Sequence, residues 1–255
     1  MGNLDLDFSF FLKYLFNPPS ILLWGLWLTI SVSIVAQTLG VTLGFFVALA
    51  RLSKRKWLSS LAVFYIWAWR GTPILVQLVL IYTGVAAAGI YKYPDLVFGP
   101  FRLSGPLQAA ILTLSLNEAA YMAEIFRAAI SSIDKGQNDA AKALGMTPAI
   151  SMRRIILPQA LRIVIPPLGN EFTLMLKGTS LLSIIGIREL FGTLQSINAA
   201  TFRTFELFII AAIWYLVLTT IMGFVQRHLE AKFGQQDSTT PLGKIGRRTL
   251  FSGHR

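Results

Sequence analysis

The sequence contains no cysteine among its 255 residues and carries few charged side chains. Without cysteine, the chain can form no disulfide, no thiolate nucleophile and no cysteine metal ligand. Only 14% of the residues are charged, whereas 54% are hydrophobic and the mean hydropathy is +0.60. This balance is typical of a membrane protein and does not fit a soluble domain.

Residue patterns that mark enzymes are also missing. The two histidines, His228 and His254, lie near the C-terminus and form no ligand cluster. The sequence shows no nucleophile–base pair and no metal-ligand spacing. It also lacks the Gly-x4-Gly-Lys-Ser/Thr loop that cradles a nucleotide phosphate. We therefore expect a protein that is not an enzyme and that binds no cofactor or metal of its own.

Acidic residues are scarce relative to basic ones, with 12 of the former and 23 of the latter, which gives a net charge of +11. Such a surplus could indicate a nucleic-acid partner, but these charges lie between hydrophobic runs and not on an exposed domain. A cytoplasmic excess of lysine and arginine facing anionic membrane lipid explains the surplus better. The expected partner of the basic residues is therefore lipid and not nucleic acid.

Long hydrophobic runs predict an all-α, polytopic membrane protein with about five spans. The first run contains small residues at every fourth position, which allows close contact with another helix. A basic cluster at 51–56 follows it, so the N-terminus is expected outside and the C-terminus inside. Residues 1–20 are expected to form an extracytoplasmic, interfacial segment without a cleavable signal, and residues 231–255 a disordered, basic cytoplasmic tail. The expected spans are residues 21–50, 57–90, 106–130, 168–186 and 205–225, and the small residues are Ala36, Gly40, Gly44 and Ala48.

The stretch at 136–167 predicts two short helices joined by a tight turn on the water-facing side. Asn138 is expected to cap the first helix, and Gly145 to end it in a left-handed conformation. Thr147 is a suitable cap for the second helix, with Pro148 at its first position. Pro158 is expected to end that helix, because the residue before a proline is disfavoured in helical geometry.

This stretch resembles the EAA loop of the permease subunits of bacterial ABC importers with the type I fold. The resemblance implies that the loop, at 134–167, is a coupling helix that docks on a cytoplasmic ATPase. The one departure is an aspartate where the family has a glutamate, which keeps the charge on a shorter arm. The residues that match the pattern, and that are expected to couple the chain to the ATPase, are Asp139, Ala140, Ala141, Gly145, Ile155, Leu157 and Pro158.

Two further stretches resemble the polar amino-acid branch of that family, the histidine, glutamine and arginine type. They are Arg70-Gly71-Thr72-Pro73 with Gln77, and the sequence GNEFTLMLKGTSLLSIIGI at the fourth span. The resemblance covers roughly residues 20–230. It implies a subunit that carries a polar or charged amino acid across the bacterial inner membrane. The implied partners are a dimeric ATPase that binds ATP and magnesium, a second identical or different permease subunit, and an extracytoplasmic substrate-binding protein.

Three charged residues are expected near the middle of the membrane. Straight helices would place Arg70, Glu118 and Lys177 roughly 15–20 Å into their spans. Glu118 could then meet the ammonium of an amino acid, and Arg70 or Lys177 its carboxylate. A closed ion-pair network that holds the helices together is the equally open alternative. Neutral hydrogen bonds could come from nearby Asn170, Thr179 and Ser180.

The alternative function is an ATP-independent secondary carrier or channel subunit. Such a protein would not need the coupling loop, and a self-sufficient carrier is often built from inverted repeats, of which the sequence shows none clearly. Co-purification with an ATPase would distinguish the two functions.

Overall fold

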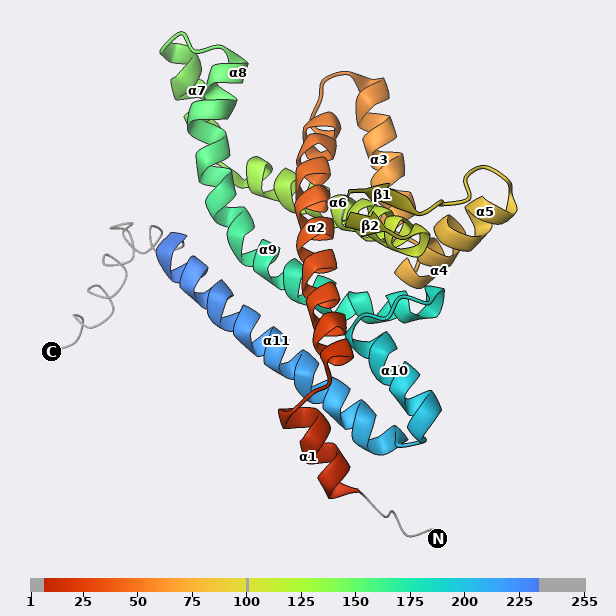
Figure 1. Ribbon diagram of the computed structural model, residues 1–255. Helices are drawn as coiled ribbons and strands as arrows, with labels where there is room; N and C mark the ends of the chain where they lie inside the picture. The colour runs from red at the N-terminus through yellow and green to blue at the C-terminus, as the bar shows by residue number, and fades with distance from the viewer. Residues whose placement is uncertain (1–6, 100, 234–255) are drawn as a thin grey trace, which may run out of the picture.

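The computed structural model describes residues 7–99 and 101–233, and helices make up most of it (Figure 1). Of the predicted tail, residues 234–255 lie outside the described residues, whereas 231–233 continue the last helix. The helices are α1 (Phe8–Phe16), α2 (Ser20–Arg51), α3 (Lys56–Arg70), α4 (Ile74–Val79), α5 (Val85–Ala87), α6 (Gly105–Ser132), α7 (Lys135–Ala143), α8 (Pro148–Ser151), α9 (Leu157–Gly178), α10 (Leu190–Thr201) and α11 (Thr204–Phe233).

The α2–α6 pair forms the centre of the fold, and the small-residue stripe of α2 makes the close helix contact that was expected of it. All four stripe residues of α2 are buried. A Cβ atom on Gly44 would lie 2.7 Å from the Met122 Cβ and 2.8 Å from the Ala119 carbonyl oxygen. Such a contact is possible only without a side chain, so the two backbones approach closely here. The stripe therefore packs within this chain.

The second expected span is bent and not straight. The axes of α3 and the following segment, Ile74–Ala87, differ by 102° across a break at residues 71–73. Gly71 and Pro73 account for the break, since proline cannot donate to a helix that runs through it. A π-helical turn at Leu80–Gly84 joins α4 to α5. The expected loosening is therefore confirmed, but its size, a turn through more than a right angle, was not foreseen.

A short β-hairpin follows and is the one addition to the expected helical fold within the described residues. Strands β1 (Leu96–Phe98) and β2 (Phe101–Leu103) pair antiparallel. Asp95 ties the hairpin to α6, because its carboxylate accepts from Arg102 and from the Gly105 backbone N–H at 2.9 Å. These hydrogen bonds, first of all the one from Arg102, lower the pKa of the Asp95 carboxyl.

The stretch at 136–167 confirms some of its predicted signals and corrects others. Gly145 has φ +72° just after α7, and the Thr147 hydroxyl accepts from the Ile150 N–H at the start of α8. Asn138 is not the cap of the first helix, because α7 begins three residues before it. Asp134 takes that role by accepting from the Gly136 N–H at 2.6 Å. Aspartate and asparagine are similarly good caps, and here the Asp134 carboxylate is the one that accepts from a free N–H of the first turn.

Pro158 does not end the second helix, which was the prediction. A π-helical stretch, Met152–Ile156, connects α8 to α9, and the Leu157 N–H bonds to the Met152 carbonyl five residues back. Pro158 lies where the hydrogen-bond spacing changes from five residues to four, so its missing N–H is tolerated. The expected fourth span, 168–186, is therefore the second half of a longer helical run that ends in a 3-10 turn at Thr179–Ile185.

The polar stretch before the last span forms a helix, α10. Its Leu190, Thr193 and Leu194 are buried, and they pack with α2 and α11. In the described part of the chain, α2 and α11 are each long and apolar enough to cross a membrane, and the bent α3–α5 pair makes a third candidate. The fold is thus a mostly helical membrane protein.

Candidate functional site

A cavity of about 490 Å³ opens between α3, α4, α6 and α9. Arg70 contributes a positive charge at the end of α3, and Glu118 a carboxylate from α6. Two of the three charged residues that were expected to approach each other therefore share one cavity. The remaining lining residues are Gly71, Thr72, Pro73, Ile74, Leu114, Asn117, Tyr121, Glu171, Leu174, Met175 and Gly178.

The break between α3 and α4 is held in shape by side-chain amides. The Gln77 Nε2 donates to the carbonyls of Trp69 at 2.7 Å and Thr72 at 3.1 Å. The Asn117 Nδ2 in turn donates to the Gln77 Oε1 at 2.8 Å. Helix breaks inside a membrane need such partners, because lipid cannot satisfy the freed carbonyls. The turn that carries Arg70 is thereby fixed against α6.

Arg70 makes no ion pair within the described residues. Its guanidinium lies over the Tyr121 ring, 5.1 Å from the ring centroid, an arrangement that stabilises a cation next to an aromatic face. Glu171 is the acidic side chain in the same cavity that lies within electrostatic reach of Arg70. The charges of the cavity are therefore not closed into a hydrogen-bonded ion-pair network.

Glu118 is 5% exposed and is held from the side of α2. Its Oε1 accepts from the Gln37 Nε2 at 2.8 Å. A Cβ on Gly40 would lie 2.5 Å from the Glu118 Cγ, so α2 leaves room for this side chain. The carboxylate is thus anchored on one side and borders the cavity on the other.

The other expected path residues do not line the cavity. Lys177 and Asn170 are exposed on other faces of α9. The Thr179 and Ser180 hydroxyls donate to their own helix, at the carbonyls of Leu176 and Lys177. Glu171, Asn117 and Tyr121 take part instead. The spacing of Glu171, Leu174, Met175 and Gly178 along one helix face could have revealed the inward face of α9.

Part of the surface that the α7–α8 knob was expected to offer to the ATPase is buried inside the knob. Ala141 is fully buried, and Ser151 is 4% exposed with its hydroxyl 3.1 Å from the Asn138 Oδ1. Asp139, Ala140 and Gly145 are exposed. Leu144, at the tip, is 75% exposed. Toward α9, Ile155 and Leu157 are partly buried, while Pro158 is exposed.

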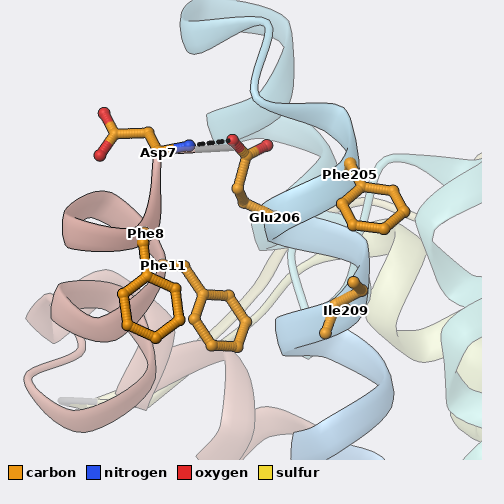
Figure 2. Close-up of a pocket in the computed structure, with 6 residues that line it drawn as sticks. All are labelled: Asp7, Phe8, Phe11, Phe205, Glu206 and Ile209. Carbon is orange, nitrogen blue, oxygen red and sulfur yellow. Dashed lines mark hydrogen bonds between the residues drawn. The ribbon is translucent and has the colours of Figure 1, made fainter. Parts of the chain in front are cut away.

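A smaller cavity of about 160 Å³ lies between α1 and the start of α11 (Figure 2). Its walls are apolar side chains, Phe8 and Phe11 from α1, and Phe205 and Ile209 from α11. The Asp7 N–H donates to Glu206 at 3.1 Å at the rim, as the dashed line shows. These contacts fasten α1 to α11.

The described residues contain no group of three or more metal-ligating side chains. The geometry is that of a cavity with opposite charges in its wall, joined through the helical run of α9 to the α7–α8 knob.

Comparison with known proteins identifies this architecture. Residues 40–235 match the family described as the binding-protein-dependent transport system inner membrane component. This chain belongs to that family. Its members are non-catalytic inner-membrane subunits of ABC importers, so the expectation of a transport subunit and not an enzyme is confirmed.

Individual proteins similar to this chain are subunits of amino-acid transporters. The arginine transport system permease protein ArgU of Corynebacterium glutamicum is 42% identical over 217 residues, which cover 83% of this permease and 68% of ArgU. The glutamine transport system permease protein GlnP of Escherichia coli is 37% identical over 213 residues, covering 83% and 92%. A crystal structure of an amino acid ABC transporter with histidines superposes with a TM-score of 0.77 at 38% identity, covering 89% of this permease and 98% of that chain.

Proposed function

We propose that this permease carries a polar or charged amino acid inward through the cavity between α3, α4, α6 and α9. The observation that supports this most directly is the cavity itself, which holds Arg70 beside the carboxylates of Glu118 and Glu171. An amino acid presents one carboxylate and one ammonium, so Arg70 can bind the first and Glu118 the second. Relatives named for arginine and glutamine transport support the same substrate class.

The permease crosses the membrane five times in this proposal, with its N-terminus outside and its C-terminus in the cytoplasm. Of the five proposed spans, α6 and α9 are the two whose sequences are not apolar enough to be recognised as spans from composition alone. They carry the charges of the cavity, such as Glu118 and Glu171, which explains their lower hydropathy. The basic residues after α2 and at the end of α11 set the orientation.

Single cysteines test this topology cleanly, because the chain has none of its own. An impermeant thiol reagent applied from outside should label Val97→Cys in the hairpin, where Val97 is 67% exposed. It should not label Lys142→Cys in the knob. The reverse labelling pattern would rule out the proposed orientation.

The α7–α8 knob is the proposed contact with a dimeric ATPase that binds ATP and magnesium. The exposed Leu144 offers an apolar anchor at the tip, and the left-handed Gly145 shapes the turn beside it. Ala141 supports the knob from inside, where its side chain is fully buried. A second permease subunit and an extracytoplasmic substrate-binding protein complete the proposed importer.

Uptake into proteoliposomes tests the function as a whole. The permease is reconstituted with its co-purified ATPase and binding protein, and labelled L-arginine, L-glutamine and L-leucine are supplied outside. We expect uptake of a polar amino acid only when hydrolysable ATP is inside. Equal uptake with a non-hydrolysable ATP analogue would instead support the ATP-independent carrier or channel.

A further inference from the structure

Gln37 lies behind the Glu118 side chain, on the side away from the charged cavity. It lies on α2, is 6% exposed, and donates its Nε2 to the Glu118 Oε1 at 2.8 Å. It also lines a second cavity of about 480 Å³ between α2, α9 and α11, whose other walls are largely apolar. The side chain therefore separates a charged cavity from an apolar one.

The Gln37 amide makes one hydrogen bond among the described residues. In the part of the chain that the structure describes, its buried Oε1 accepts no hydrogen bond, so the bond to Glu118 is the only one that this side chain makes. A buried polar atom without a partner is costly. If this side chain only filled space, an apolar residue would avoid the free-energy cost of the unpaired Oε1. The presence of glutamine therefore favours a role for its Nε2 donor.

The surroundings of Glu118 make that donor important. On the α2 side, the absence of a Cβ at Gly40 lets the Glu118 side chain lie against the backbone. On the cavity side, Arg70 comes from α3, Glu171 from α9, and Asn117 and Tyr121 from α6 itself. Within residues 7–99 and 101–233, the Glu118 carboxylate accepts a single hydrogen bond, from Gln37.

Without the Gln37 donor, the carboxylate would be free to turn away from α2 and into the cavity that Arg70 also lines. Arg70 has no ion-pair partner of its own within the described residues, and opposite charges in a low-dielectric site attract strongly. The two groups would then neutralise each other and would no longer be available to an ammonium and a carboxylate.

We propose that Gln37 is a positioning residue that keeps the Glu118 carboxylate on the α6 wall, apart from Arg70, so that both can bind a zwitterionic amino acid. Gln37 does not touch the substrate and acts through Glu118. This inference rests on the proposed function of the cavity.

A double-mutant cycle tests the inference. The variants are Gln37→Leu, Glu118→Gln and the two combined, each purified as the complete permease–ATPase complex. The measured quantity is the dissociation constant for labelled L-arginine and L-glutamine without the binding protein, whose own affinity would otherwise mask the change. The amino acid that binds the wild type more tightly is used as the probe.

We expect Gln37→Leu to weaken binding about tenfold, as loss of one charge-assisted hydrogen bond would. In the Glu118→Gln background, the same change should have little further effect, because its target is already neutral. Independent, multiplying effects of the two substitutions would overturn the inference. Unchanged binding in Gln37→Leu would overturn it as well.

Two further variants separate positioning from structural damage. Thr38→Val is the matched control, since Thr38 is the next residue on α2 and its hydroxyl donates only to its own helix at Ile34. It should bind like the wild type. The exchange Gln37→Glu with Glu118→Gln keeps the hydrogen-bonded pair but moves the charge to α2, and it should fold normally and still bind weakly.

Failure of the inference and failure of the proposed function give different results. Unchanged binding in Glu118→Gln would refute the role of the cavity carboxylate itself. Weak binding in Glu118→Gln together with normal binding in Gln37→Leu would refute only the role of Gln37. If Gln37→Leu does not assemble, the exchange variant decides, and normal binding there would overturn the inference.

Discussion

Two buried carboxylates contact α2 from opposite parts of the fold, and their surroundings differ sharply. Glu189 is fully buried and accepts hydrogen bonds from the Thr29 hydroxyl, the Tyr215 hydroxyl and the backbone N–H groups of Phe191 and Gly192, at 2.7–3.1 Å. Glu118 accepts one hydrogen bond from the described residues, that of Gln37, and borders a cavity of about 490 Å³.

The number of protein donors around each carboxylate distinguishes a structural charge from a ligand-binding one. Four donors from three segments satisfy the Glu189 carboxylate, so it has no capacity left for a ligand and instead joins α2, α10 and α11. Glu118 keeps free acceptor capacity beside a cavity and an Arg70 without an ion pair. Burial alone does not separate the two, but the count of protein donors does.

The largest effect should come from removing the satisfied carboxylate. Glu189→Leu leaves four donors without their acceptor, two of them on the backbone of α10, and we expect a loss of at least about 3 kcal/mol in stability. Thermal unfolding in detergent measures this, with Glu189→Gln as a control that keeps one acceptor oxygen and should lose less. A Glu189→Leu protein as stable as the wild type would show that the four hydrogen bonds to Glu189 do not stabilise the fold.

Each of the two carboxylate-bearing residues packs against a glycine of α2, Glu189 against Gly25 and Glu118 against Gly40. A Cβ on Gly25 would lie 2.9 Å from the backbone oxygen of Glu189, which cannot move away. A Cβ on Gly40 would meet the Glu118 side chain at 2.5 Å, and that side chain borders an open cavity. Gly25→Ala should therefore lower the melting temperature more than Gly40→Ala.

Gly40→Ala should act mainly on substrate binding. Because the new methyl group displaces Glu118, we expect weaker amino-acid binding in a protein that still assembles. Melting temperature and dissociation constant, measured on both glycine variants, check the pair. The opposite assignment, with binding lost in Gly25→Ala and stability lost in Gly40→Ala, would contradict the structural interpretation.

A change outside both regions should leave both measurements intact. Leu144→Asp places a charge on the exposed tip of the knob, 75% exposed in the wild type. We expect transport and substrate-stimulated ATP hydrolysis to fall about tenfold, since apolar anchors supply much of the affinity of protein contacts. Melting temperature and substrate affinity of the permease should not change, and normal transport would argue against the proposed ATPase contact.

The smallest effect is expected for Tyr215→Phe. It removes one of four donors from Glu189 and leaves the ring in place, so a loss of about 1 kcal/mol in stability should result. Unfolding by heat or denaturant in detergent would show it. A loss as large as that of Glu189→Leu would mean that the four donors act as one cooperative unit.

The sequence predicted the parts of this fold that depend on local patterns. The small-residue stripe of α2, the left-handed Gly145 and the capping by Thr147 follow from the residues themselves. Arg70 and Glu118 were expected together because a charge inside a hydrophobic run needs a cavity or a partner. The family resemblance was confirmed by the match over residues 40–235.

Other features could not be read from the sequence, because they depend on distant contacts. Lys177 was expected in the passage, but it lies six residues after Glu171 on α9, about 240° around the helix. Only the packing of α9 decides which of the two faces inward. The 102° bend after Arg70 likewise needs Asn117 on α6, which supports the Gln77 that holds it.

The most direct test of the central distinction is the affinity of Glu118→Gln for its amino acid. This change keeps the shape of the side chain and removes its charge. The permease–ATPase complex, without binding protein, should bind the better of L-arginine and L-glutamine about tenfold more weakly, with a melting temperature close to that of the wild type. Unchanged affinity, or a fall in melting temperature as large as that of Glu189→Leu, would contradict the account.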